Sequence, residues 1–116
     1  MAAGSSPVGR TAGPWTHYVV VRDDLRCGVL AAQIVHAAAE SWPGGLPSGT
    51  RAVVLAARDE AHLPAIEHRL IRERVGHVAI REPDSPWHGQ LMAIGMVPVV
   101  DRRTIAHVTA RLRLLA

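Results

Sequence analysis

Lysine is missing from this 116-residue sequence, in which all 13 basic residues are arginine. No lysine amine is therefore present to act as a base, a nucleophile or a Schiff-base partner. Every cationic side chain is instead a guanidinium, which stays charged and can bind a phosphate through two parallel hydrogen bonds. The formal net charge of +3 is compatible with a nucleic-acid partner, although a charge this modest is also common in proteins that bind none.

Cysteine and long apolar runs are scarce as well. Cys27 is the only cysteine, so no disulfide can form within the chain, which favours a reducing compartment and predicts a cytoplasmic protein. No apolar run approaches the roughly 18 residues of a membrane-spanning helix, and the opening MAAGSSPVGRTAGP lacks the apolar core of a secretory signal. Because this opening is small, polar and rich in proline and glycine, we predict that residues 1–14 form a disordered lead.

Motifs for metal and cofactor chemistry are also missing. No spacing of cysteine and histidine resembles a zinc site. Neither a glycine-rich phosphate loop nor a Gly-x-Ser-x-Gly nucleophile motif is present. We therefore expect no metal and no cofactor.

Residues 15–116 are predicted to form a single α/β domain. β-Branched runs indicate buried strands and apolar residues at helical spacing indicate helices, which gives four strands (16–22, 51–57, 77–82 and 90–98) and three helices (28–41, one within 59–75 that starts near 62, and one capped by Asp101). In this β-α-β-α-β-β-α order, the two strand–helix–strand units predict parallel pairing with helices on both faces of the sheet. The short connection between the last two strands predicts an antiparallel pair.

The helix predicted over residues 28–41 carries two polar residues among alanine, valine, isoleucine and leucine. Gln33 and His36 share one stripe with Val29 and Glu40, at spacings of i, i+4, i+7 and i+11. The neighbouring positions, which we expect to pack on the sheet, are Leu30, Ala31, Ile34, Val35 and Ala38. This spacing predicts that Gln33 and His36 lie beside the buried face, either as functional groups near the carboxyl ends of the strands or as solvated side chains.

The same segment resembles a known family. VVVRDDL, followed by G-V-L-AAQIVHAA, is similar to the first strand and helix of the type 2 peptidyl-tRNA hydrolases, where an Arg-x-Asp-Leu strand end precedes Gly-Lys-x-Ala-Ala-Gln-x-x-His-Ala. LMAIGMVPVVDRRTIAHVTARLRLL resembles the closing strand and helix of that family, and the similarity runs from about residue 16 to residue 115. The resemblance implies a three-layer α/β/α fold with a four-stranded mixed sheet, a homodimer, and cleavage of the ester between a peptide and the 3′ end of tRNA without a metal.

Matching positions give the site that this resemblance implies. Arg22 and Asp24 match the strand-end pair, Gly28 matches the glycine that opens the helix, and Gln33 and His36 match the polar pair of the helix. In this interpretation Gln33 and His36 orient water or the ester carbonyl, while Arg22 and Gly28 bind substrate. Asp24, the third catalytic candidate beside them, holds the first loop, and the alternative is that it only caps the helix or braces the loop.

Two departures from the family pattern bear on activity. Val29 stands where the family has a lysine, so Arg26 or the strand-end arginine would have to stabilise the negative charge that develops on the ester. The family's loop with an acid and hydroxyls is here REPDSPWHGQ, in which Glu82 or Asp84 is the candidate acid and His88 a further polar group. This loop resembles that of a divergent branch, the peptidyl-tRNA hydrolase domain-containing proteins.

The predicted function is therefore that of a peptidyl-tRNA hydrolase-like esterase with tRNA as its partner. Two alternatives stay open. One is a catalytically impaired member of the fold that binds tRNA or a protein, and the other is a tailoring enzyme that acts on a small aminoacyl substrate. The residue at position 29 and the loop over 83–89 are the features that separate them.

Overall fold

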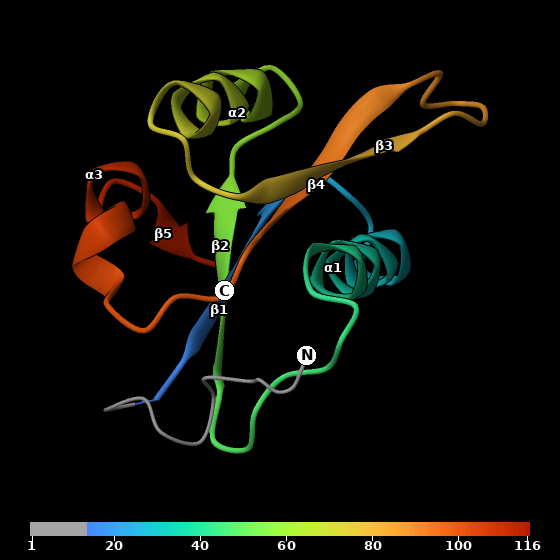
Figure 1. Cartoon of the computed structure of the whole chain (residues 1–116). Coiled ribbons are helices and arrows are strands. Elements are labelled where there is room, and N and C mark those ends of the chain that lie inside the picture. Colours follow the sequence, from blue (N-terminus) through green and yellow to red (C-terminus); the bar gives the residue numbers. More distant parts are fainter. Residues whose placement is uncertain (1–13) are drawn as a thin grey trace.

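The computed structural model describes residues 14–116, so the lead predicted over residues 1–14 lies almost wholly outside the described residues. The elements form one α/β domain around a mixed sheet (Figure 1). In chain order they are β1 (Thr16–Arg22), α1 (Cys27–Ser41), β2 (Arg51–Ala57), α2 (His62–Arg72), β3 (His77–Glu82), β4 (Gln90–Met96), the 3₁₀ turn η2 (Arg102–Ile105), α3 (Ala106–Thr109) and β5 (Arg113–Leu114). No helix within residues 14–116 is long and apolar enough to cross a bilayer.

The sheet has five strands in the order β3-β4-β1-β2-β5. β1 and β2 are parallel, from Thr16 opposite Arg51 to Arg22 opposite Ala57. β4 runs antiparallel to both β1 and β3. The α/β class, the predicted antiparallel pair and the first of the two predicted parallel units, β1 with β2, are therefore confirmed. The second predicted unit is wrong as a pairing, because β1 and β4 lie between β2 and β3 in the sheet.

The prediction of four strands is wrong by one strand. The sequence predicts a last helix whose inner face includes Leu112, but α3 ends at Thr109. The chain then turns, and Arg113–Leu114 pairs with Leu55 and Ala56 of β2 as the antiparallel strand β5. A strand of two residues is too short to show an alternating pattern. β5 is therefore a strand because it pairs with β2, and its own sequence does not indicate one.

Most element boundaries agree with the sequence prediction. β1, β2 and β3 have the predicted limits, α2 starts at His62 as expected, and β4 ends at Met96 rather than at residue 98. The side chain of Asp101 accepts a hydrogen bond from the backbone N–H of Arg103 at 3.0 Å, so the predicted cap is confirmed. The element that it caps is the short turn η2 and not a long helix.

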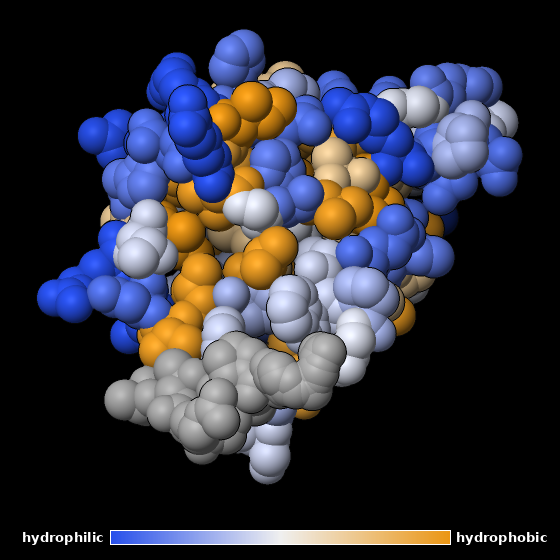
Figure 2. All heavy atoms as spheres, viewed as in Figure 1, coloured by the Kyte–Doolittle hydropathy of each residue, from blue (hydrophilic) through white to orange (hydrophobic). Residues whose placement is uncertain are grey.

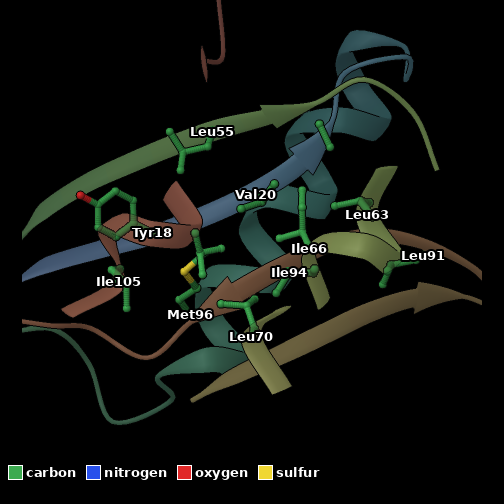
Figure 3. Close-up of a cluster of buried hydrophobic side chains, with 12 residues drawn as sticks. Tyr18, Val20, Leu55, Leu63, Ile66, Leu70, Leu91, Ile94, Met96 and Ile105 are labelled. Atoms are coloured by element: carbon green, nitrogen blue, oxygen red, sulfur yellow. The ribbon is translucent and has the colours of Figure 1, made fainter. Parts of the chain in front are cut away.

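β1 distributes its side chains between the two faces of the sheet, as the alternation of a strand requires. Tyr18 and Val20 belong to one buried cluster, which we call the α2-side cluster because Leu63, Ile66 and Leu70 of α2 pack into it (Figure 3). Val19 and Val21 of β1 belong to a second cluster, the α1-side cluster, which also contains Ala37, Ile80, Met92 and Ala93. Figure 1 shows α1 and α3 on opposite sides of β1 and β2.

α1 packs very close to β4 because Gly95 has no side chain. A Cβ on Gly95 would overlap the carbonyl oxygen of Ala37 and lie 2.6 Å from Oγ of Ser41. The buried Ser41 hydroxyl donates to that carbonyl at 2.7 Å, so it accepts its second hydrogen bond from Nε2 of His17 at 2.8 Å. These contacts determine both the distance of α1 from the sheet and the rotation of α1 about its axis.

Burial of His17 predicts a loss of stability in acid. The residue is 4% exposed, and burial lowers its pKa below the ordinary value of 6.5, against the opposing effect of a hydrogen bond to the Met96 backbone. Between the folded and unfolded pKa values the unfolded chain binds more protons. The free energy of unfolding therefore rises with pH in that window. As the pH falls below about 6.5, the contribution of this one group is lost, by at most about 1.4 kcal/mol per pH unit.

Urea unfolding from about pH 5 to about pH 7.5 measures this slope. His17→Asn, which keeps a polar group but does not titrate, should flatten the slope. A residual slope of the same sign comes from His62, whose pKa is also lowered by burial and by Arg58. The same change at exposed His68 is the matched control, and this variant should show the same slope as the parent protein. An unchanged slope in His17→Asn would contradict the assignment.

Candidate functional site

Arg22 anchors a polar cluster at the carboxyl end of β1. Its Nε and Nη2 donate to the two carboxylate oxygens of Asp24 at 2.7 and 2.8 Å, and its Nη1 donates to Oε1 of Gln90 at 2.8 Å. The guanidinium carbon lies 5.3 Å from the ring centroid of Trp87, within the range of a cation–π interaction. Although Arg22 is only 6% exposed, its charge is compensated, because hydrogen bonding to Arg22 holds the pKa of Asp24 below its usual value.

A β-bulge in β4 brings this strand under the guanidinium. Met92 is the extra residue, opposite the step from Ile80 to Arg81 in β3. In a regular strand Met92 and Ala93 would point to opposite faces, but here both belong to the α1-side cluster. The sulfur of Met92 consequently lies 4.0 Å from Nη1 of Arg22. Through Met92 and Trp87, Arg22 therefore contacts two side chains of the α1-side cluster.

Gln33 lies inside the buried face of α1 and not beside it, which corrects the sequence prediction. It is 5% exposed, and its Oε1 atom has no hydrogen-bond partner among the residues that the structure describes. α1 runs in the direction of β4 and touches Gly95 through Ala37, so one turn earlier, about 6 Å back along the helix, Gln33 faces the level of Ala93. Val35, which is expected on the sheet, is 67% exposed instead.

His36 lies on the outside of α1. Its side chain is 62% exposed, and its Nδ1 is 4.0 Å from a carboxylate oxygen of Glu40, one turn further along the helix. The structure therefore separates the predicted polar pair, with Gln33 buried and His36 in solvent. The stripe of residues drawn from the sequence crosses the boundary between the buried and the exposed sides of the helix.

The first turn of α1 places the other predicted residues at the surface. Arg26 is the exposed N-cap residue, and no side chain caps the helix, so Asp24 braces the loop through Arg22 and is not a helix cap. Gly28 is exposed and a Cβ there would meet nothing within 4 Å, so no close packing requires glycine at this position. Val29 is half-buried and packs against the α1-side cluster.

The turn between β3 and β4 holds the residues predicted to replace the family's loop. Asp84 and His88 are exposed and Glu82 is half-buried. The backbone carbonyl of Asp84 accepts hydrogen bonds from the backbone N–H groups of Trp87 and His88 at 2.8 and 3.1 Å, which folds the turn. Figure 2 shows hydrophilic residues gathered over the tip of this hairpin. Among the described residues, Glu82, Asp84 and His88 make no side-chain hydrogen bond or ion pair with Arg22, whereas Trp87 makes a cation–π contact with it.

Gln90 and Trp87 are the site residues that the sequence interpretation missed. Both contact Arg22 from more than sixty positions away in the chain, so no local spacing connects them with it. The available signal was compositional: a tryptophan within the turn PDSPWHG is a large apolar ring in an otherwise polar segment. A ring in such a place needs a surface to pack on, and the guanidinium provides it.

No family model matches this chain, and no curated protein matches it either. Within the part of the chain that the structure describes, no three histidine, cysteine, aspartate or glutamate side chains lie close enough together to hold a metal ion.

Proposed function

We propose that this protein is a peptidyl-tRNA hydrolase-like esterase that cleaves the ester between a peptide or an N-acyl-amino acid and tRNA. The observation that carries the proposal is the buried amide oxygen of Gln33, which has no partner among the described residues. Leaving such an acceptor unpaired costs about 1–3 kcal/mol, so a native protein keeps one where a water or a ligand uses it. The resemblance places the amide that orients water at this same position.

The proposal gives each polar residue a distinct role. The Gln33 oxygen accepts a hydrogen bond from the attacking water and orients it toward the ester carbonyl. Arg26, the exposed N-cap residue of α1, supplies positive charge to the oxygen that becomes negative, in place of the lysine that the family has where this chain has Val29. Asp24 is a positioning residue, because both of its oxygens are bound by Arg22 and its lowered pKa makes it a poor base. His36 contacts the substrate from the exposed rim.

A release assay tests the proposal directly. The substrate is an N-acyl-aminoacyl-tRNA with a labelled acyl group, and the comparison is the same ester without the tRNA body. We expect release from the tRNA substrate and much slower release from the small ester, because binding of the remote tRNA body contributes to positioning the ester. Equal rates on the two substrates would favour the small aminoacyl substrate, and no release from either would contradict the esterase.

Restoring the family's charge at position 29 gives a second test. Val29→Lys should raise the rate of release, with a ceiling of roughly 100-fold for one electrostatic donor. Ala31→Lys, which adds the same charge at another exposed position of the same helix, is the matched control and should leave the rate nearly unchanged. If Val29→Lys folds and binds tRNA but still hydrolyses nothing, the loop over 83–89 is the deeper defect and the esterase proposal fails.

A second candidate function is a tRNA-binding or protein-binding module without catalysis. The observation that favours it is that Asp24 is fully engaged by Arg22, so no acidic side chain of the polar cluster is available as a base. Filter binding with an intact ester separates the two candidates. Tight binding with no release over many binding lifetimes identifies the module.

The homodimer and the cytoplasmic location stay predictions. The large apolar side chains most exposed on α1 and the loop that follows it are Val35, Leu46 and Trp42, at 67%, 41% and 38%. A dimer formed through this surface would bury them. Sedimentation of the parent protein and of Val35→Asp checks it, since a charge there should shift a dimer toward the monomer.

A further inference from the structure

A groove of about 310 Å³ lies on the other face of the sheet, between α2 and the segment that follows α3. One wall comes from α2, the other from the end of α3 and the chain beyond it, and one end from the residue after β2. The lining residues are Arg58, His62, Ala65, Ile66, Arg69, Val108, Arg111 and Leu112. Three of these eight side chains are guanidinium groups and none is a carboxylate, so the groove is strongly cationic.

The arginines of the groove differ from most others in how their charge is compensated. Arginines at positions 22, 81, 103 and 113 each face a carboxylate within ion-pair distance. Arg58 and Arg111 have no side-chain hydrogen bond or ion pair within residues 14–116. Arg69 is held in place by its Nη2, which donates to the backbone carbonyl of His107 at 2.6 Å, a bond that leaves its charge uncompensated. One fixed and two free guanidiniums therefore surround the same space.

His62 adds a neutral donor to this groove. Its Nδ1 accepts a hydrogen bond from the backbone N–H of Arg58 at 3.1 Å, so in the neutral ring the proton is on Nε2. Burial, and then the charge of Arg58, lowers the pKa of His62, which keeps the ring neutral near pH 7. The ring is thus prepared to donate a hydrogen bond to an anion without adding a fourth positive charge to the unoccupied groove.

We infer that this groove binds a phosphate group, held by the guanidiniums of Arg58, Arg69 and Arg111. A phosphate offers oxygens on several sides, and guanidinium forks from both walls can bind them together. The apolar residues Ile66, Val108 and Leu112 form the floor and exclude water from these bonds, which strengthens them.

One end of the groove lies at the same edge of the sheet as the cluster around Arg22. Arg58 directly follows Ala57, whose Cα pairs with that of Arg22, and the backbone N–H of Asp23 donates to the Ala57 carbonyl at 2.9 Å. Arg113, just beyond the groove, forms an ion pair with Asp23. An RNA strand that crosses this edge can place a phosphodiester in the groove and its 3′ end at Gln33. In this form the inference rests on the proposed function.

Arg102 and Arg103, which the charge pattern of the sequence also suggests for the tRNA backbone, lie elsewhere. They follow Val99 and Val100, and Val99 pairs with Thr16 at the amino end of β1. Arg103 is also bound at both ends of its fork by Asp101, at 3.0 and 2.9 Å. The groove arginines are therefore nearer to the end of the sheet that carries the ester site than Arg102 and Arg103 are.

The test uses the full chain and two probes, inorganic phosphate and deacylated tRNA, which carries no ester. NMR signals of the His62 ring report occupancy of the groove without any reaction. We expect phosphate to shift these signals and to raise the pKa of His62. Arg58→Gln with Arg111→Gln should weaken phosphate binding at least tenfold. The matched control removes two charges elsewhere, with Arg51→Gln and Arg72→Gln, and should change binding less than twofold.

The tRNA arm identifies where the phosphate comes from. If tRNA competes with phosphate, the groove double variant should flatten the log–log salt dependence of tRNA binding by roughly 1.4 to 1.8, since each lost contact removes about 0.7 to 0.9. If phosphate binds and tRNA does not compete, the source is a free phosphorylated small molecule, and the site stands while its link to the esterase is lost. Absence of any His62 response to phosphate at low salt overturns the inference. If the parent protein binds phosphate in the groove but releases no ester from tRNA, the proposed function fails while the phosphate site stands.

Discussion

Gly95→Ala should destabilise this protein more than any other single methyl group added to it. The new Cβ would overlap the backbone carbonyl oxygen of Ala37 and come within 2.8 Å of both side-chain atoms of Ser41. A backbone oxygen within α1 cannot turn aside, so the helix must move away from the sheet. Overpacking of this kind costs about 1–3 kcal/mol, and the involvement of backbone places this site at or above the top of that range.

The movement should also break the polar contacts that lie under the helix. The Ser41 hydroxyl accepts from His17 and donates to Ala37, and all three groups are buried. A buried donor or acceptor that loses its partner costs a further 1–3 kcal/mol, roughly. Urea unfolding measures the sum. Gly44→Ala, at a loop glycine where a Cβ meets nothing within 4 Å, is the matched control and should stay within about 0.5 kcal/mol of the parent. A loss below about 1 kcal/mol for Gly95→Ala would show that α1 can shift freely, contrary to the packing described.

The strands and α2 could be predicted from the sequence because their signals are local. The β-branched run of β1 predicts a strand that is buried on both faces, and Pro64 limits where α2 can begin. β5 could not be predicted, because its two residues become a strand only through pairing with β2. The same distinction explains the site. Arg22 and Asp24 are two residues apart and were identified, whereas Gln90 and Trp87 reach them through the fold.

The orientation of α1 shows most clearly what the sequence leaves open. Many of its residues are alanines, which can face either the sheet or solvent, so periodicity alone does not determine the rotation of the helix. A contact between distant residues, Gly95 with Ala37 and Ser41, determines it instead. That rotation turns Gln33 inward and Val35 outward, and it converts the predicted polar stripe into one buried amide and one exposed imidazole.

Gln33→Leu should separate stability from function at this position. Leucine has nearly the same volume and removes the buried amide oxygen that lacks a partner, so the free energy of unfolding should stay the same or rise by about 1 kcal/mol. Turnover of the labelled N-acyl-aminoacyl-tRNA should nevertheless fall by roughly 100-fold, because a water that is no longer oriented loses its position relative to the ester. Val35→Leu, on the exposed side of the same helix, is the matched control for both measurements.

The opposite pattern would be equally informative. A purely structural amide would show a loss of stability in Gln33→Leu, with turnover reduced only in proportion to the folded fraction. Gln33→Glu adds a third measurement, since a carboxylate can accept the same hydrogen bond from water but has to be buried with its charge. The variant should lose stability as the pH rises through the raised pKa expected of a buried carboxyl. If it still turns over the substrate faster than Gln33→Leu, the role of an acceptor at this position is supported. If both variants are as active as the parent protein, the buried amide has no part in hydrolysis and the esterase loses the observation on which it rests.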